Sequence, residues 1–445
     1  MAYKLRRFKD IIAINYVDSV SQKDTFMAFH AHNMEVADIS AETFAAMTEI
    51  SIHDGTVPTP NEDLLTTEAG QELQNWSQES SAEAKTVPIN FGIRGIAINV
   101  NQICNLKCAY CAAGGDGTYG EPMNQISVEQ TLPQLKYFLS ALPDGAKFSI
   151  SFIGGEPLLH PEAIKAIYDY TEAEGAKRNI SAHMGIVTNG TLINGKTLDI
   201  IRSMKIHLTI SLDGIKEFND VVRPSKNGKS TTDMVLASLK NLSENRGLVQ
   251  SIGIAAVHSE GNEDMITNYS FFRNLNPDWM EFNIAYSEKS PHLQESFIKQ
   301  MEQIAQIAWE SGGEDELRKI KTFNHYFKMF DSQLRIENHC GAGKSYLAVD
   351  SKNSLYPCHW FIGKKSEKAG QGAQLNPDVL ANYSKSLIEL NNCQSCWARY
   401  LCGGGCMYIH SEHTGSKHVK DKLFCERTRS LILTSLLYYK LARSA

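Results

Sequence analysis

The stretch RGIAINVNQICNLKCAYC, residues 94–111, joins a strand pattern to three closely spaced cysteines. The first seven residues are mostly apolar and include β-branched side chains, which is typical of a buried strand. Cys104, Cys108 and Cys111 then follow in the spacing C-x3-C-x2-C. Three thiolates on one loop can bind three irons of a 4Fe–4S cube and leave the fourth iron without a protein ligand. Zinc is the alternative, but a structural zinc site usually closes with four ligands, and no fourth cysteine or histidine lies nearby.

Strand and helix patterns alternate from this stretch to about residue 312. Strands are predicted at 94–100, 148–153, 183–190, 206–214, 250–259 and 279–286, with a helix after each. The first of these helices opens with Ser127 and Gln130, a pair typical of a helix N-terminus. This alternation indicates βαβ crossovers and a parallel sheet. Six units are fewer than the eight of a closed barrel, so we expect an α/β fold with a partial (β/α)6 TIM-like barrel.

Polar, glycine-marked loops follow the first four predicted strands. The three cysteines follow the first strand, GGEP at 154–157 the second, TNG at 188–190 the third and SLDG at 211–214 the fourth. In a parallel α/β barrel the carboxyl ends of the strands form one face, where ligands bind. We therefore expect the four loops to converge on a single site.

Composition narrows the class of protein. The 445 residues carry a net charge of −6, which does not indicate nucleic acid or an anionic membrane as a partner. No apolar run approaches the ~20 residues of a spanning helix, and no secretory signal precedes the first strands. We expect a cytoplasmic protein that binds neither nucleic acid nor membrane. In that reducing compartment, ten clustered cysteines favour metal binding over disulfides.

The cysteine motif and the loops after it resemble the radical S-adenosylmethionine (SAM) superfamily. The resemblance implies a SAM-binding 4Fe–4S cluster on Cys104, Cys108 and Cys111. It also implies SAM-site positions at Tyr110, Gly154, Gly155, Glu156, Pro157, Thr188, Asn189, Ser211 and Arg223. Tyr110 would pack beside the adenine, and GGEP would cradle the amino group of the SAM methionine. In this family one electron cleaves SAM to a 5′-deoxyadenosyl radical, while the protein contributes position and shielding.

The other seven cysteines all lie beyond residue 339, in a tail with little regular pattern before a last helix expected after Cys425. Their order resembles the SPASM domain, which carries two auxiliary 4Fe–4S clusters in peptide- and protein-modifying radical SAM enzymes. The resemblance implies one cluster ligated fully by Cys393, Cys396, Cys402 and Cys425. It implies a second cluster on Cys340, Cys358 and Cys406, whose fourth ligand is not identified. The chain would then hold three 4Fe–4S clusters.

One position departs from the SPASM pattern. The family often has glycine five residues before the second of these cysteines, and this chain has Asn353 there. Asparagine tolerates left-handed backbone angles, so we expect the turn to survive. Two zinc sites are the alternative for the seven thiols, with a histidine as a further ligand. The candidates are His339, His359 and His410.

About 90 residues without cysteine precede the barrel. Their strand patterns, followed by a helix pattern at 41–50 with Ser40 as its N-cap, resemble the small α+β winged-helix-like domain of ribosomal-peptide maturases. Such a module captures a leader peptide as an added strand at a sheet edge. A role in packing or dimerisation is the alternative. We therefore predict a peptide-recognition domain at 1–90, a radical SAM partial barrel at 91–312 and an irregular iron–sulfur domain at 313–445.

Together these resemblances imply a radical SAM/SPASM oxidoreductase that modifies a ribosomally synthesised precursor peptide. It would form an intramolecular thioether, carbon–carbon or carbon–oxygen cross-link, with electrons from a flavodoxin- or ferredoxin-type donor. The reaction needs a base, and Asp213 and Glu281 both lie near strand ends, so the catalytic base stays open. Two other functions also stay open. One is protein oxidation to formylglycine, as in anaerobic sulfatase maturases, and the other is a non-catalytic iron–sulfur electron carrier.

Overall fold

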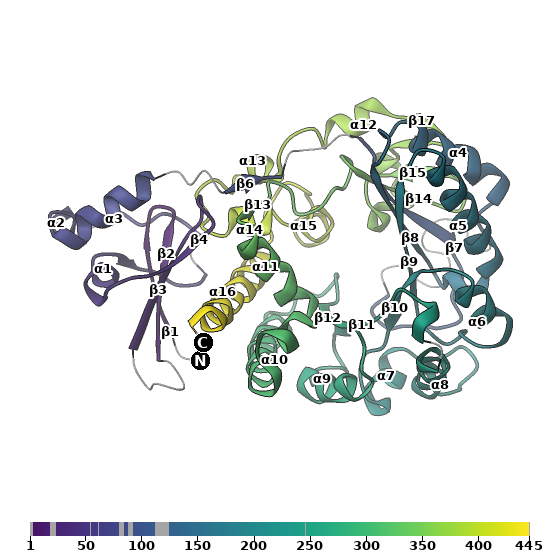
Figure 1. Ribbon diagram of the computed structural model, residues 1–445, viewed down its shortest axis with the longest axis horizontal. Coiled ribbons are helices and arrows are strands. Elements are labelled where there is room, and N and C mark those ends of the chain that lie inside the picture. Colours follow the sequence, from purple (N-terminus) through teal and green to yellow (C-terminus); the bar gives the residue numbers. More distant parts are fainter. Residues whose placement is uncertain are drawn as a thin grey trace. The chain divides into compact units, whose positions relative to one another are not determined.

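The computed structural model describes residues 3–17, 24–53, 55–60, 62–79, 84–87, 92–111, 124–244 and 246–444. The chain forms two compact units, neither of which is continuous in sequence (Figure 1). The barrel unit comprises residues 90–288 and 341–384, and the terminal unit comprises residues 1–89, 289–340 and 385–445. Across the part of the chain described, no helix is long and apolar enough to cross a bilayer. The three functional domains expected from the sequence stay a prediction.

The barrel unit is built on parallel strands. They are β7 (Gly95–Asn101), β8 (Lys147–Gly154), β9 (Ser181–Thr188), β10 (His207–Ser211), β11 (Ser251–His258) and β12 (Trp279–Ile284). Each pairs in parallel with the next. The helices between them are α4 (Val128–Ser140), α5 (Pro161–Ala176), α6 (Gly195–Arg202), α7 (Lys216–Val222), α8 (Thr231–Ser243) and α9 (Met265–Asn274). The predicted α/β partial barrel is confirmed, whereas α7 was not predicted.

A later segment completes the same sheet. Strand β14 (Tyr346–Val349) pairs in parallel with the free side of β7, and β15 (Ser354–Tyr356), β16 (Gly370–Gln371) and β17 (Gln374–Leu375) follow in antiparallel order. Asn353 lies in the turn before β15 with φ of 60°, as the sequence predicted. Its side chain accepts a hydrogen bond from Thr131 in α4 at 2.9 Å. The sequence did not predict these four strands.

The two faces of the six-stranded sheet differ. Alternate side chains, such as Phe148, Ile150 and Phe152 of β8, are buried. In β8 to β12 most of the side chains between them are at least partly exposed, and we call this side the open face; all seven residues of β7 are buried. It carries Ser149, Ser151, His183, Val187, His207, Thr209, Ser211, Ser251, Ala255, Glu281 and Asn283. Parallel sheets are usually covered on both faces, so an open face with many polar side chains can receive a ligand.

The terminal unit begins with an antiparallel sheet. Its strands are β1 (Tyr3–Phe8), β2 (Ile11–Val17), β3 (Asp24–His30), β4 (Glu35–Asp38) and β5 (Thr48–Glu49), in the order β4-β3-β2-β1-β5. The helices α1 (Ala41–Ala45), α2 (Glu62–Leu65) and α3 (Glu68–Gln78) accompany it. Ser40 caps α1 as predicted, since its hydroxyl accepts a hydrogen bond from the Thr43 N–H at 3.0 Å. This region is therefore α+β, as expected.

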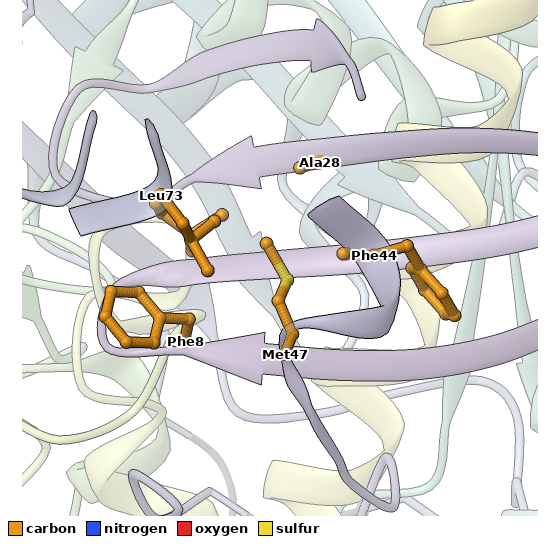
Figure 2. Close-up of a cluster of buried hydrophobic side chains, with 7 residues drawn as sticks. Phe8, Ala28, Phe44, Met47 and Leu73 are labelled. Atoms are coloured by element: carbon orange, nitrogen blue, oxygen red, sulfur yellow. The ribbon is translucent and has the colours of Figure 1, made fainter. Parts of the chain in front are cut away.

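Apolar side chains join this sheet to its helices. Phe8 and Ala28 from the strands meet Phe44 of α1, Met47 after it and Leu73 of α3 (Figure 2). All five are buried. Complete burial of a large apolar side chain contributes about 1.5–3 kcal/mol, so this cluster is sufficient to hold the helices against one face of the sheet.

The rest of the terminal unit is mostly helical. It contains α10 (Pro291–Arg318), α11 (Lys321–Asp331), α13 (Leu387–Leu390), α14 (Arg399–Cys402), α15 (Met407–Thr414) and α16 (Lys422–Ser444), with β6 (Lys85–Thr86) paired to β13 (Leu334–Arg335). The last helix expected after Cys425 is present as α16, but it begins earlier, at Lys422, and so includes that cysteine. Asp421 starts the helix early, since its carboxylate accepts a hydrogen bond from the Phe424 N–H at 2.7 Å.

Candidate functional site: strand ends and cysteine clusters

The barrel unit brings the predicted SAM-site residues together at the carboxyl ends of its parallel strands. Strands β7 to β10 are parallel neighbours, so the loops at their carboxyl ends lie side by side. These loops hold Cys104, Cys108, Tyr110, Cys111, Gly154, Gly155, Glu156, Thr188, Asn189 and Ser211. Arg223, from the end of α7, joins them through the contacts described below.

The Cys104 thiol lies among N–H donors. The backbone N–H of Leu106 points at its sulfur at 3.4 Å, and the Asn189 side-chain amide lies at 3.6 Å. Burial raises the pKa of the Cys104 thiol to about 11, while these donors act in the opposite direction because they stabilise a thiolate. A metal ion deprotonates a coordinating thiol outright. This donor set therefore fits an iron-bound thiolate.

The three thiols of the loop interact electrostatically. Burial raises the pKa of Cys108, the Arg223 guanidinium lowers it and Cys111 raises it further, while Cys108 itself raises the pKa of Cys104. None of the ten cysteines, all of which are described, forms a disulfide. No three His, Cys, Asp or Glu side chains of the described residues converge where one metal ion would bind. Three thiols on one loop, each able to bind a separate iron, match the protein donor set of a 4Fe–4S cluster.

The glycines of GGEP let β8 end against the start of the cysteine loop. A Cβ at Gly155 would lie 2.3 Å from the carbonyl oxygen of Ile103, and one at Gly154 would lie 2.4 Å from that of Asn101. Backbone hydrogen bonds fix this approach, from Gly155 N–H to Asn101 and from Glu156 N–H to Ile103, both at 2.8 Å. No larger residue would allow the two backbones to pack so closely.

Glu156 ties two strand ends together. Its carboxylate accepts hydrogen bonds from the Leu158 N–H at 2.9 Å, the Thr188 hydroxyl at 2.7 Å and the Asn189 N–H at 2.7 Å. Burial raises its pKa, and these three hydrogen bonds oppose that rise. An ionised carboxylate can accept about four hydrogen bonds. Glu156 therefore braces the site and keeps capacity for one further donor, such as an ammonium group.

Tyr110, which is partly buried, forms a hydrogen-bonded triad with the buried Asp213 and Arg223. The Tyr110 hydroxyl donates to the Asp213 carboxylate at 2.5 Å and accepts from the Arg223 guanidinium at 2.6 Å. Asp213 also accepts from the Val257 N–H at 3.0 Å. Burial raises the pKa of Asp213, while Arg223 and Tyr110 oppose the rise. Asp213 thus anchors Tyr110 and Arg223 internally, and this role makes it a poor candidate for the base.

Backbone pairing brings Arg223 to the cysteine loop. The Lys107 N–H donates to the Pro224 carbonyl and the Ala109 N–H to the Val222 carbonyl, each at 2.9 Å. Sequence reasoning found Arg223 but not this pairing, because no local pattern signals it. It also missed Asn105, which accepts from the Asn189 amide at 2.8 Å and carries no signal beyond its place in the loop.

Ser211 lies where the carboxyl ends of the strands meet the open face. It ends β10, is half-buried and pairs with Ala255 of β11, which pairs in turn with Glu281 of β12. Residues paired in register on neighbouring strands share a face. Glu281 is therefore on the same side of the sheet as Ser211, whereas Asp213 lies in the interior.

Four of the C-terminal cysteines share one neighbourhood in the terminal unit. Burial raises the pKa of Cys402 well above its usual value, and Cys425, Cys396 and Cys393 raise it further. These are the four predicted to ligate one cluster fully, and their thiol donors fit such a group. Of the other three, Cys340 raises the pKa of Cys406 within the terminal unit, and Cys358 belongs to the barrel unit.

A run of three glycines turns the chain between Cys402 and Cys406. Gly404 has φ of +84°, and a Cβ there would lie 2.5 Å from the carbonyl carbon of Leu387. The nearby histidines have other contacts. His339 lies 3.1 Å from the Cys402 carbonyl oxygen, and His410 accepts from the Asp421 N–H at 3.1 Å. These contacts give the two rings structural roles in holding the cysteine segment.

Comparison with known proteins identifies this architecture. Residues 98–272 match the Radical SAM superfamily model. An uncharacterised protein of Methanocaldococcus jannaschii is 30% identical over 203 residues, which cover 45% of this chain and 66% of that protein. The serine-type anaerobic sulfatase-maturating enzyme of Klebsiella aerogenes is 24% identical over 325 residues, covering 69% of this chain and 78% of that enzyme.

Two solved structures share the fold. The anaerobic sulfatase maturase anSMEcpe, with bound AdoMet and Cp18Cys peptide, gives a TM-score of 0.63 at 20% identity over 79% of this chain and 99% of its own. Streptococcus suis SuiB, also solved with its precursor peptide SuiA, gives 0.51 at 14% identity over 94% of this chain and 98% of its own. The chain therefore carries a radical SAM domain and is homologous to the anaerobic sulfatase-maturating enzymes of that superfamily.

Proposed function

We propose that this radical SAM enzyme cross-links a ribosomally made precursor peptide. The observation that carries the proposal is the N-terminal sheet. An enzyme that modifies small molecules does not need such an extra domain. About four-fifths of the chain follows residue 90. The match to anSMEcpe covers 79% of the chain, about the share that follows residue 90. The match to SuiB covers 94% of the chain and therefore includes most of the first 90 residues as well. An exposed sheet edge can bind a peptide as an added strand, and β4 and β5 are the edges here.

The chain's own residues would hold the cofactors. Cys104, Cys108 and Cys111 would ligate the SAM-binding 4Fe–4S cluster, and the seven later cysteines would hold two auxiliary clusters. When bound, and reduced by a flavodoxin- or ferredoxin-type donor in the cytoplasm, the cluster and SAM would supply a radical able to remove a hydrogen atom from unactivated carbon. Tyr110 and Arg223, held by Asp213, would orient SAM, and Glu156 would accept a hydrogen bond from its amino group.

The open face would receive the core of the peptide. It borders Ser211 and offers small hydroxyl groups, two histidines and one carboxylate among apolar side chains that include Ile153, Val257 and Trp279. This surface can hydrogen-bond to an extended backbone as well as to polar side chains. Its length across the five strands β8 to β12, about 4.8 Å apart, suits several residues of a peptide better than one small metabolite.

Glu281 is our candidate for the base. In the six strands, all of which are described, it is the one acidic residue, and register puts it on the open face two strands from Ser211. Two strand spacings correspond to about 10 Å, within reach of a bound peptide. The cross-link removes two hydrogens from the substrate. One would leave as a hydrogen atom and the other as a proton to Glu281, and an auxiliary iron–sulfur cluster could accept the remaining electron.

Co-expression with a short peptide encoded beside the gene tests this function. We expect a product lighter by two hydrogen atoms, with tandem mass spectra that show two residues joined. Glu281→Gln should still release 5′-deoxyadenosine but give little cross-linked peptide, whereas Glu172→Gln, an exposed carboxylate on α5 outside the open face, should behave as wild type. Full cross-linking by Glu281→Gln would exclude Glu281 as the base.

Formylglycine formation is the second candidate, because the sulfatase-maturating enzymes are sequence relatives. A serine converted to formylglycine also loses two hydrogens, so mass alone does not separate the reactions. An aldehyde that reacts with a hydrazide probe would favour this candidate. An unreactive product with two linked residues would favour the cross-link.

A further inference from the structure

We propose that the N-terminal domain positions the ligand loop of an auxiliary cluster. The ligand loop is residues 393–402, which carries three of the four cysteines assigned to one cluster. The contacts come from Arg7, near the end of β1, and from Asp10, in the turn between β1 and β2. This role goes beyond peptide capture, and it rests on the proposed ligation of a cluster by Cys393, Cys396, Cys402 and Cys425.

Asp10 reaches the ligand loop through Arg399. The two oxygens of its carboxylate accept from the two terminal nitrogens of Arg399 at 2.8 and 2.6 Å. One of these nitrogens also donates to the carbonyl oxygen of Cys396 at 3.1 Å. A bidentate pair of this kind fixes both distance and orientation. The guanidinium, largely buried, therefore links the β1–β2 turn directly to the backbone of a cysteine in the loop.

Arg7 makes a second, independent connection. Its side chain is fully buried and donates to the Ser395 carbonyl oxygen at 2.5 Å. The same guanidinium group donates to Lys9 at 2.7 Å and Thr56 at 2.8 Å, both through backbone carbonyls of the N-terminal domain. Arg7 thus joins the N-terminal domain to the peptide unit just before Cys396.

The ligand loop has little regular secondary structure before α14, so side-chain contacts from outside the loop matter for its position. Between Cys393 and α14 the backbone makes turn-like hydrogen bonds, from Cys396 to the Cys393 carbonyl at 2.9 Å and from Arg399 to the Cys396 carbonyl at 3.2 Å. Short turns define local shape but not the position of a loop in the fold. The contacts from Arg7 and Asp10 contribute to that position, together with the buried side chain of Trp397 and the hydrogen bond from the Ile336 N–H to the Tyr400 carbonyl at 2.9 Å. Residues that orient metal ligands affect both the retention of a metal and its potential.

Asp10 also contributes charge to this neighbourhood. Burial raises its pKa, but the hydrogen bond and charge of Arg399 outweigh burial, and the pKa is lowered overall. The carboxylate is therefore ionised at neutral pH and partly neutralises Arg399. Removal of a negative charge near an iron–sulfur cluster makes the cluster easier to reduce.

The test measures iron, sulfide and potential in the anaerobically purified full chain. In Asp10→Ala we expect a loss of about four irons per chain, one cube, while the SAM-binding cluster is retained. In the milder Asp10→Asn we expect iron to be kept but the auxiliary potential to become more positive. Asp10→Glu should restore both values. The matched control is Asp38→Ala, which removes an ion pair to Lys440 in the same unit but away from the ligand loop.

The outcomes are decisive in either direction. Wild-type iron and potential in both Asp10→Ala and Asp10→Asn would overturn the proposal. Equal loss of iron in the Asp38→Ala control would overturn it as well, because the effect would then reflect general instability. If Asp10→Ala does not fold, the potential of Asp10→Asn decides. No readout depends on peptide turnover, so failure of the proposed cross-linking function would be seen separately.

Discussion

The two cysteine regions are positioned by different means. The barrel loop with Cys104 follows a strand of a parallel sheet, and its neighbours are the ends of adjacent strands. The ligand loop at 393–402 lies among short helices and turns, and side chains from the N-terminal domain hold it. The position of the barrel loop thus follows from the hydrogen-bonded strands of the sheet. The position of the ligand loop depends more on side-chain contacts between residues far apart in the sequence. We therefore expect the ligand loop to depend more on individual side chains outside it.

The largest effect should come from loss of a cluster ligand. Cys104→Ala should abolish SAM cleavage, because the SAM-binding cluster would lose one of three thiolates. Cys402→Ala should lower iron by about four per chain yet leave uncoupled SAM cleavage measurable. The measurements are 5′-deoxyadenosine release and iron content under reducing, anaerobic conditions. Retained turnover in Cys104→Ala would refute the assignment of that ligand.

A smaller effect should come from replacing one closely packed glycine in each region, Gly155 beside the barrel loop and Gly404 beside the ligand loop. In Gly155→Ala the new Cβ would lie 2.3 Å from a backbone oxygen, and in Gly404→Ala it would lie 2.5 Å from a backbone carbon. Either overpacked residue should cost about 1–3 kcal/mol. Gly155→Ala should reduce iron at the SAM site alone, and Gly404→Ala should reduce auxiliary iron. The control is Gly247→Ala, where a Cβ meets no atom within 4 Å. The same pattern of iron loss in both variants would contradict the separation of the two regions.

The smallest effect concerns the segment that brings Arg223 to the barrel loop. Asp220 in α7 accepts from the Thr231 hydroxyl and the Thr232 N–H, each at 2.8 Å. Burial alone would raise its pKa, but hydrogen bonds from Ser230, Thr232 and Thr231 lower it to about 2. Its stabilisation is therefore full above its unfolded pKa of 3.8 and is lost as the pH falls towards about 2.

Asp220→Asn should lower the free energy of unfolding by about 1 kcal/mol at neutral pH, a value reduced for solvent screening. Urea unfolding of both proteins at a series of pH values checks this. The difference between them should shrink as the pH falls below the unfolded pKa. A difference that stays constant into acid would assign the effect to packing instead of charge.

Local and periodic features could be predicted from the sequence. The six strands, the caps at Ser40 and Ser127 and the loops after each strand all follow from residue order within about twenty positions. Strand β14 could not be predicted in the same way, because a four-residue apolar run fits many structures. Helix α7 was missed because its seven residues lie between stronger signals.

Long-range contacts account for the rest. The hydrogen bond from Tyr110 to Asp213 spans 103 positions, and that from Arg399 to Asp10 spans 389. No pattern in either segment indicates its partner. The sequence therefore left Asp213 and Glu281 as equal candidates for the base, and their burial and register support our proposal of Glu281.

The pairing of β14 with β7 has a consequence for synthesis on the ribosome. All seven residues of β7 are buried, and β8 covers only one of its two sides. The second side stays unsatisfied until residues 346–349 leave the exit tunnel, some 250 positions later. An unpaired strand edge invites association with other chains. Nascent chains halted before residue 346 should therefore aggregate or recruit chaperones, whereas chains that extend past β14 should escape both fates.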